Sequence, residues 1–361
     1  GSGSAGAAST LGSADVINGG GGTDTLKLTT EGGAAVAATP NLTSVEKVFV
    51  QATTTAGGTT VNMVNATGTT EIWNERSTDA VGLAVTNVQE LATVGVKGAI
   101  TGGSTYQVGF KDSLASGTSD SLSIALDGAT ITNLGVGGMT AANEFETLNI
   151  SATGTNVVTN LIQGTGGGAL AATKTVNVTG AGKVTVTAAL AATVTTVDAS
   201  ANTGGVSFDL SGTGAVTAKG GSGADTFKMG GSLTTADVLT GGDGTDIIGV
   251  TAGASLVTGL QVTGFETLDV GGSNSGAGVA LSVNTYDLSK LTGITTLKVG
   301  SIINNDALPV ADDTTTINNL AKGAAVQINA ALGTGAGDQL VINVKDAGAG
   351  SPNDIIGVTV S

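Results

Sequence analysis

Two nine-residue blocks in the second half of the chain have the residue types and spacing of a cation-binding turn. They are residues 220–228, GGSGADTFK, and residues 241–249, GGDGTDIIG. Both fit the pattern G-G-x-G-x-D-x-U-x, in which U is apolar. Glycine lets a tight turn adopt positive φ and direct its carbonyl oxygens inward, and Asp225 and Asp246 add carboxylates. Roughly six to eight such oxygens at about 2.3–2.6 Å are what calcium requires.

The spacing of the two blocks predicts how they lie in space. Residues 232–240, SLTTADVLT, lack the glycines but keep Asp237 in the position of the motif aspartate, and the three extra residues 229–231 precede them. In a roll with two such blocks per coil, the complete blocks stack on the same side, one coil apart. Parallel strands stack about 4.8 Å apart. We therefore predict that Asp225 and Asp246 face one ion.

A stretch near the N-terminus repeats this arrangement. Residues 14–24, ADVINGGGGTD, match residues 236–246, ADVLTGGDGTD. Further along, residues 42–50, LTSVEKVFV, match residues 262–270, VTGFETLDV. The chain therefore contains an internal duplication of a long module, and Asp24 occupies the position of Asp246.

The duplication divides the chain into two expected modules, residues 1–218 and residues 219–361. The first begins with a single complete block, and we expect its partner block to lie upstream of residue 1. The opening residues, GSGSAGAAST, lack the basic and apolar segments of a signal peptide and are interpreted as a fragment boundary.

Short segments of alternating apolar and polar residues recur along the chain and are typical of β-strands. Residues 145–150 (FETLNI) and 339–344 (QLVINV) are examples. With the motif, they predict an all-β parallel solenoid or β-roll with calcium-binding turns; an array of β-sandwich domains is the alternative. Helical signal is weak and confined to possible single turns at residues 35–38, 188–192 and 314–322.

Composition excludes several functional classes. The chain has no His and no Cys, which excludes a Ser-His-Asp triad, a cysteine nucleophile, a disulfide and a zinc site of the usual kind. Its net charge of −15 argues against nucleic-acid binding and against anionic lipid. No apolar run reaches the length of about 18 residues that a transmembrane helix needs. We predict a protein that is not an enzyme, with no nucleic-acid partner and no membrane insertion.

Two further groups of acidic residues have simpler interpretations. Residues 71–79, EIWNERSTD, surround the only Trp and the only Arg. We favour a solvated loop anchored by Trp73, with a sugar-binding patch as the alternative. The glutamates near recurrent strand starts are interpreted as solvent-facing residues that cap a coil, rather than as metal ligands. They are Glu46, Glu90, Glu146 and Glu266.

The blocks resemble the RTX repeats of bacterial proteins secreted by the type I pathway. The sequences GGGGTDTL and GGDGTDII, the second followed by FETLDV in a Thr-, Ala-, Gly- and Val-rich chain, are similar to RTX-type surface-layer proteins of Gram-negative bacteria (the Caulobacter and Campylobacter fetus type). Two features depart from that family. The nonapeptides here are few and interrupted by residues 229–231, and no C-terminal secretion signal is evident.

The resemblance implies Ca²⁺ held by the motif carboxylates and by turn carbonyls of successive coils. The candidate metal-binding residues are Asp15, Asp24, Asp225, Asp237, Asp243, Asp246, Gly19, Gly20, Gly22, Gly220, Gly221, Ser222, Gly223, Gly241, Gly242 and Gly244.

The resemblance also implies a function. Such proteins are secreted structural subunits that assemble with copies of themselves through calcium into a lattice on the cell surface, held on lipopolysaccharide or other surface glycans. The alternatives are an RTX adhesin or biofilm-matrix binding protein, and the accessory region of a secreted enzyme.

Overall fold

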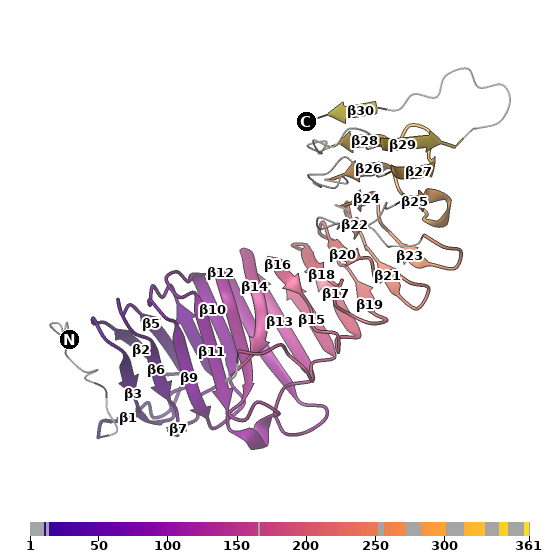
Figure 1. The fold of residues 1–361 in the computed structure, drawn as a ribbon. Coiled ribbons are helices and arrows are strands. Elements are labelled where there is room, and N and C mark those ends of the chain that lie inside the picture. The colour runs from indigo at the N-terminus through magenta and orange to yellow at the C-terminus, as the bar shows by residue number, and fades with distance from the viewer. Residues whose placement is uncertain are drawn as a thin grey trace. The chain divides into compact units, whose positions relative to one another are not determined.

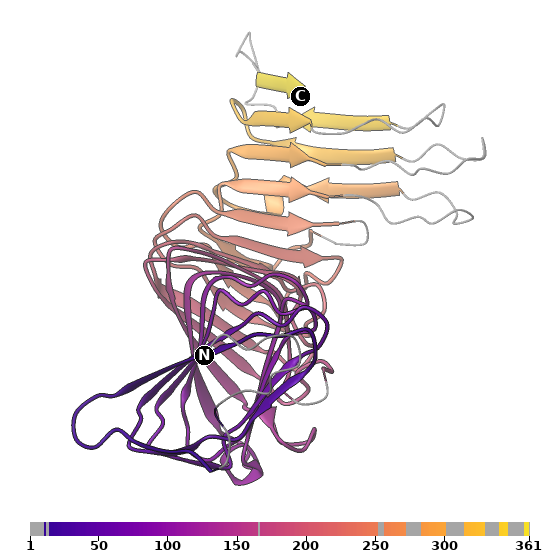
Figure 2. The same cartoon turned by 90° about the vertical axis from the view of Figure 1, so that its left-hand side faces the viewer.

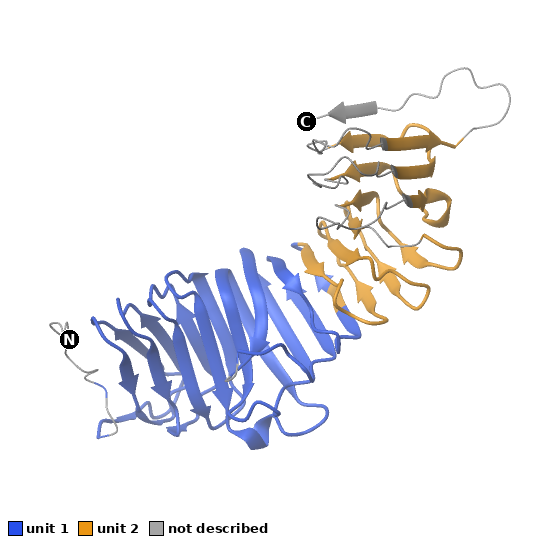
Figure 3. Ribbon diagram, viewed as in Figure 1, with its two compact units in different colours: residues 1–197, 201–204 blue, residues 198–200, 205–361 orange. Residues whose placement is uncertain are grey.

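The fold is a stack of parallel β-coils, described here from a computed structural model (Figures 1 and 2). The structure describes residues 11, 14–164, 167–251, 256–271, 283–300, 314–328, 339–345 and 357–360. The first ten residues, interpreted above as a fragment boundary, therefore lie outside it. Two compact units are distinguished, residues 1–197 with 201–204, and residues 198–200 with 205–361 (Figure 3).

Unit 1 contains three ladders of parallel strands. The first consists of β2 (Thr25–Thr30), β5 (Lys47–Ala52), β8 (Glu71–Glu75), β10 (Thr93–Ala99), the first part of β12 (Ser121–Gly138), β13 (Thr147–Thr153) and β15 (Thr175–Gly180). The second consists of β3 (Val36–Ala38), β6 (Thr59–Asn62), β9 (Leu83–Val88), β11 (Thr105–Phe110), the second part of β12, β14 (Thr155–Gln163) and β16 (Lys183–Ala189). The third is short and consists of β1 (Val16–Asn18), β4 (Asn41–Thr43) and β7 (Asn65–Thr67).

Unit 2 is built in the same way. One ladder consists of β18 (Val206–Asp209), β20 (Thr226–Gly230), β22 (Ile247–Val250), β24 (Thr267–Val270), β26 (Thr296–Val299), β28 (Ala325–Ile328) and β30 (Gly357–Val360). A second consists of β19 (Thr217–Lys219), β21 (Val238–Thr240) and β23 (Gln261–Thr263), and a third of β25 (Val283–Asp287), β27 (Thr314–Leu320) and β29 (Gln339–Val344). β17 (Thr196–Asn202) contributes residues to both units. The two helical segments are single 3-10 turns, η1 (Asp112–Leu114) and η2 (Leu288–Lys290).

The core of each unit is a column of aliphatic and aromatic side chains, one from each coil. In unit 1 the residues in register are Val48, Ile72, Val94, Ile124, Ile150 and Val178. In unit 2 they are Phe208, Phe227, Ile248, Leu268, Leu297 and Val326. Burying one such side chain stabilises the fold by about 1.5–3 kcal/mol. Along each strand, buried residues alternate with residues that face outward. In β5, for example, Val48, Val50 and Ala52 are buried, whereas the residues between them are not.

The predicted parallel solenoid is confirmed. Every pairing between the named strands whose register the structure gives is parallel, so the alternative of β-sandwich domains, which need antiparallel strands, is wrong.

The suggested helical turns are wrong as well. Residues 314–320 form β27, residues 36–38 form β3, and β16 extends to Ala189. Thr and Ile prefer extended backbone, and the neighbouring coils supply the hydrogen-bonding partners.

The boundary expected after residue 218 falls inside unit 2, within β19. The sequence duplication and the compact units thus divide the chain at different places. No helix in the described ranges is long and apolar enough to cross a membrane.

Candidate metal centre

Asp225 and Asp246 lie one coil apart at the start of adjacent strands, as their spacing predicts. The register pairs Thr226 with Ile247, so the aspartates that immediately precede these residues are stacked. Both are completely buried. The apolar motif residues that follow them, Phe227 and Ile248, point into the core.

These aspartates belong to a column of carboxylates that cap backbone N–H groups. The N–H of Val206 donates to Asp225 Oδ1 at 2.6 Å, and the N–H of Asp225 donates to Asp246 Oδ1 at 2.7 Å. The N–H of Asp246 donates in turn to Glu266 Oε2 at 2.8 Å. A backbone donor buried without a partner is costly, so each carboxylate stabilises the coil before its own.

The second carboxylate oxygens differ between the two aspartates. Asp225 Oδ2 accepts a hydrogen bond from the N–H of Gly221 at 2.7 Å. Asp246 Oδ2 is buried and has no hydrogen-bond partner. An anionic oxygen in this situation loses its hydration without compensation.

The turn glycines bring backbone carbonyls close to these carboxylates. A Cβ at Gly241 would lie 1.8 Å from the carbonyl oxygen of Gly264 and 2.7 Å from Asp246 Oδ2. A Cβ at Gly220 would lie 1.9 Å from the carbonyl oxygen of Gly241 and 2.3 Å from Asp225 Oδ2. Only glycine fits at these two positions, and the space that it leaves is lined with oxygen atoms.

The electrostatics of the site disfavour the charged carboxylates. Burial raises the pKa of Asp246 to about 6, and the neighbouring charges of Asp225, Glu266 and Asp243 contribute to the increase. Burial also raises the pKa of Asp225, although hydrogen bonds from Val206 and Gly221 oppose this shift. A cation among these oxygens would offset both effects.

The N-terminal copy reproduces this geometry. The N–H of Asp24 donates to Glu46 Oε2 at 2.7 Å, and Asp24 Oδ2 is buried without a partner. A Cβ at Gly19 would lie 1.9 Å from the carbonyl oxygen of Ser44. Ser44 has a φ of 50° where the second copy has Gly264 with a φ of 69°. The duplication seen in the sequence thus extends to the unpartnered carboxylate oxygen.

The other candidate aspartates are placed differently from Asp225 and Asp246. Asp237 is buried at the start of β21, on the neighbouring ladder. Its Oδ1 accepts from the N–H of Val216 at 2.9 Å, and its Oδ2 accepts from the N–H and the hydroxyl of Thr234. Asp237 is therefore a backbone cap. Asp243 is exposed in the turn, where its N–H donates to the carbonyl of Gly221, and Asp15 is exposed before β1.

The remaining candidates are turn residues. Gly20, Gly22, Ser222, Gly242 and Gly244 are exposed, whereas Gly19, Gly221 and Gly223 are half-buried and Gly220 and Gly241 are buried. The structure thus brings together Asp225, Asp246 and the glycine-rich turns around them.

The glutamates cap coils by accepting hydrogen bonds from the backbone of the preceding coil. They are not all solvent-facing as expected, because Glu146 is buried. Glu46 and Glu266 accept from motif aspartates as described, and Glu146 accepts from the N–H of Asp120 at 2.8 Å. Glu90 differs, because it accepts from the N–H of Gly68. The link between Asp120 and Glu146 was not identified from the sequence because no glycine-rich turn marks it. The sequence FETL, which residues 145–148 share with residues 265–268, is the signal that could have indicated it.

Within the described ranges, no three His, Cys, Asp or Glu side chains converge on one point. A cation at Asp225 and Asp246 would therefore take most of its ligands from backbone carbonyls. Two carboxylates among carbonyl oxygens form a hard-oxygen donor set, which suits Ca²⁺ and offers no nitrogen or sulfur ligand.

Comparison with known proteins finds no matching family model, no similar curated protein and no similar solved structure.

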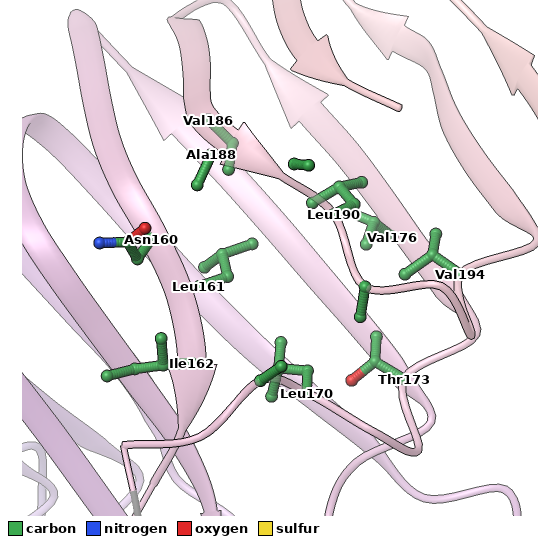
Figure 4. A pocket seen from close by; sticks show the side chains of 13 residues that line it. Asn160, Leu161, Ile162, Leu170, Thr173, Val176, Val186, Ala188, Leu190 and Val194 are labelled. Carbon is green, nitrogen blue, oxygen red and sulfur yellow. The ribbon is translucent and has the colours of Figure 1, made fainter. Parts of the chain in front are cut away.

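An apolar cavity of about 210 Å³ lies elsewhere, in unit 1 (Figure 4). Leu161, Leu170 and Val194 are among the residues that line it, together with two polar ones, Asn160 and Thr173. Both polar side chains already make hydrogen bonds, to Asn133 and to the carbonyl of Phe145. The lining of the cavity is therefore mainly apolar.

Proposed function

We propose that this chain is a calcium-stabilised structural subunit of a bacterial surface layer, secreted to the cell surface, where it associates with copies of itself. The observation that supports calcium most directly is the buried carboxylate oxygen without a donor, present at Asp246 and again at Asp24. A carboxylate held in this state in both copies of a duplicated turn is a suitable ligand for a cation.

The residues that would hold the ion at the second copy are Asp225 and Asp246 with carbonyls of the two glycine-rich turns. Bound calcium would supply positive charge between two stacked carboxylates and thereby join successive coils. In the first copy Asp24, Gly19 and the turn around Ser44 would play the same part. Such an ion stabilises the folded chain because the unfolded chain has no preformed site.

A structural role agrees with the rest of the chain. The sequence has no His and no Cys, and the carboxylates of the site hold the backbone of neighbouring coils instead of facing a substrate cavity. The acidic composition, with 28 Asp and Glu against 13 Lys and Arg, suits divalent cations as links between copies. Lipopolysaccharide or another surface glycan is the proposed anchor.

The decisive experiment combines metal analysis with electron microscopy in the presence and absence of millimolar calcium. We expect bound calcium and ordered sheets only when calcium is present. The double variant Asp225→Asn/Asp246→Asn should lose at least one equivalent of calcium and some thermal stability. Asp209→Asn is the matched control, since it removes an outward-facing acid of the same unit, and it should behave as the parent chain.

The alternative functions give different results. A calcium-bound monomer that never forms sheets and binds glycans would indicate an adhesin or matrix-binding protein. Enzymatic activity in a longer parent chain would indicate the accessory region of a secreted enzyme. Unchanged calcium content in the double variant would refute the metal site itself.

A further inference from the structure

Two aromatic rings of unit 1 lie on its outer surface, whereas every other aromatic ring of the chain is buried. The sequence contains one Trp, two Tyr and six Phe. Tyr106, Tyr286, Phe110, Phe145, Phe208, Phe227 and Phe265 are all at most 1% exposed. Phe49 and Trp73 are the exceptions, and both are half-exposed. A chain so poor in aromatics places its only outward-facing rings side by side.

The two rings form a continuous row across neighbouring strands. The register aligns Lys27 with Phe49, Phe49 with Trp73, and Trp73 with Gly95. The rings of Phe49 and Trp73 are stacked, with centroids 5.6 Å apart and planes within 8°. A Cβ at Gly95 would lie 2.1 Å from Trp73 Cδ2, so the indole occupies the space that a side chain would fill. The row is therefore fixed in position.

Charged groups hold the indole on its polar side. Trp73 Nε1 donates to Glu71 Oε2 at 2.8 Å, and Lys47 Nζ lies 2.8 Å from Glu71 Oε1. Partial burial raises the pKa of Glu71, but hydrogen bonds from Lys47 and Trp73 outweigh it and leave that pKa below its ordinary value. The charge of Glu71 is thus already balanced by its neighbours.

A small polar pocket lies beside Phe49. It measures about 240 Å³ and is lined by Lys27, Leu28, Thr29, Phe49, Gln51, Glu75 and Arg76. Lys27 Nζ lies 5.8 Å from the centroid of the Phe49 ring. The pocket thus combines one aromatic wall with hydrogen-bond donors and acceptors, and it is somewhat smaller than the pockets of about 300–1,000 Å³ that hold drug-sized ligands.

Arg76 lies at a coil corner beside this pocket. It is the only arginine of the chain, and its φ is 49°, in the left-handed region that non-glycine residues seldom adopt. Its side chain is 63% exposed, and Nη1 lies 3.6 Å from Glu75 Oε1. Gly98 follows the paired residue of the next coil and has a φ of 72°, so this left-handed backbone is part of the coil corner.

We propose that this face of unit 1 binds an acidic saccharide, with one sugar ring in the pocket beside Phe49. Sugar hydroxyls both donate and accept, which matches Gln51 and Glu75, and C–H groups of a sugar pack against an aromatic ring. The cations Lys27 and Arg76 outnumber Glu75 in the pocket, although the whole chain has a net charge of −15. A carboxylate on the sugar complements this local excess, and Arg is well suited to a bidentate carboxylate contact.

This site is independent of the calcium turns and of assembly. It would give the proposed surface protein a glycan contact, but the proposal does not depend on calcium binding or on assembly. Residues 71–79 are therefore not the solvated loop expected from the sequence, because residues 71–75 form β8.

The only Trp of the chain lies on this face, so its emission reports on this site alone. Cellobiouronate and cellobiose are matched probes, because they differ only in the carboxylate. Titrated into the full chain, cellobiouronate should change the Trp73 emission in a saturable manner, and cellobiose should bind at least about tenfold more weakly. Isothermal titration calorimetry should give the same affinities.

Three variants make the test specific. Phe49→Thr introduces a residue common on the outer faces of this chain, and Arg76→Gly relieves the left-handed backbone while removing the guanidinium; each should weaken cellobiouronate binding about tenfold or more. Lys228→Thr, which removes an exposed cation of unit 2, should bind as the parent chain does. Asp225→Asn/Asp246→Asn should also keep the emission response, which separates this proposal from the calcium site.

Three results would overturn the proposal. They are the absence of a saturable response to both saccharides, unchanged binding by Arg76→Gly, and emission that depends on protein concentration without saccharide. The last result would assign the face to a second copy of the chain.

Discussion

At the scale of single residues, the buried carboxylates fall into two groups. Asp237 has a donor for each of its oxygens, whereas Asp246 has one oxygen that accepts from Asp225 N–H and another that accepts from nothing. The first arrangement is complete without a ligand. The second leaves an anion that the protein itself does not neutralise, and it makes the stability of the calcium-free chain sensitive to pH.

The raised pKa of Asp246 determines the direction of that sensitivity. Its folded pKa is about 6, against roughly 3.9 for an unperturbed Asp. Between these values the folded chain binds a proton that the unfolded chain does not, so the free energy of unfolding falls as pH rises from about 4 to 6. The expected loss is about 3 kcal/mol.

Denaturant unfolding in a chelating buffer at pH 4, 5, 6 and 7 measures this effect. As the pH rises over that range, the free energy of unfolding of the parent chain should fall relative to that of Asp246→Asn. A difference that stays constant with pH would contradict the assignment. Saturating calcium should abolish the trend, because the cation favours the ionised form.

Asn74 provides a second test at this scale. It is completely buried in β8, and neither its Nδ2 nor its Oδ1 has a hydrogen-bond partner. Val50 and Val96 occupy the same position in the adjacent coils. Asn74→Val would continue that column and remove two unsatisfied polar atoms, so the free energy of unfolding should increase by about 1–3 kcal/mol.

Asn156→Val is the matched control. Asn156 is equally buried, but its Oδ1 accepts from the N–H of Ala129 at 2.8 Å and its Nδ2 donates to the carbonyls of Thr153 and Lys183. Its replacement should destabilise the chain by a similar amount. If both variants shift thermal unfolding in the same direction, unsatisfied hydrogen bonding is not what distinguishes these two positions.

At the scale of elements, coil corners are held by side chains of the following coil. Glu146 shows this without a glycine-rich turn, since its Oε2 accepts from the N–H of Asp120. Glu146→Ala should lower the free energy of unfolding by about 1–3 kcal/mol and increase hydrogen exchange at the Asp120 amide. Glu146→Gln keeps an acceptor oxygen and should retain most of the stability. Equal losses in the two variants would show that the negative charge matters more than the hydrogen bond.

The periodicity of apolar residues and the turn glycines are sufficient to predict parallel strands joined by stacked turns. Alternating segments such as residues 145–150 indicated strands, and the spacing of the nonapeptides indicated the stacking of Asp225 over Asp246. The errors have physical causes. The strand at residues 71–75 is not evident from the sequence, because β8 turns polar Asn74 inward and this hides the alternation. Residues 314–320 lack an apolar alternation strong enough to exclude a helical turn.

The candidate site was only partly predictable for a related reason. A motif identifies which turns resemble each other, and here it predicts the stacking of Asp225 over Asp246. It does not report which oxygens already have donors. The sequence pattern therefore does not distinguish Asp237 from Asp246, and only the structure shows the unpartnered oxygen.

At the scale of the whole molecule, both units follow the same principle, in which each coil contacts mainly the coils next to it. The stability of such a stack is close to a sum of local terms. Calcium bound at the two duplicated turns should therefore protect those coils far more than distant ones. Removing the ion should consequently open the chain locally instead of lowering the stability of every coil equally.

Hydrogen exchange followed by mass spectrometry can resolve this prediction along the chain. After addition of a calcium chelator, peptides from residues 19–46 and 220–250 should exchange faster, because both contain the unpartnered carboxylates. Peptides from residues 93–138 should keep their protection, since β10 and β11 both pair in parallel with β12 and these strands contain no such turn. In Asp225→Asn/Asp246→Asn the change should be confined to residues 220–250 and should occur even with calcium. A uniform rise in exchange would mean that each unit opens as one cooperative body, and no rise at all would mean that calcium does not hold these turns.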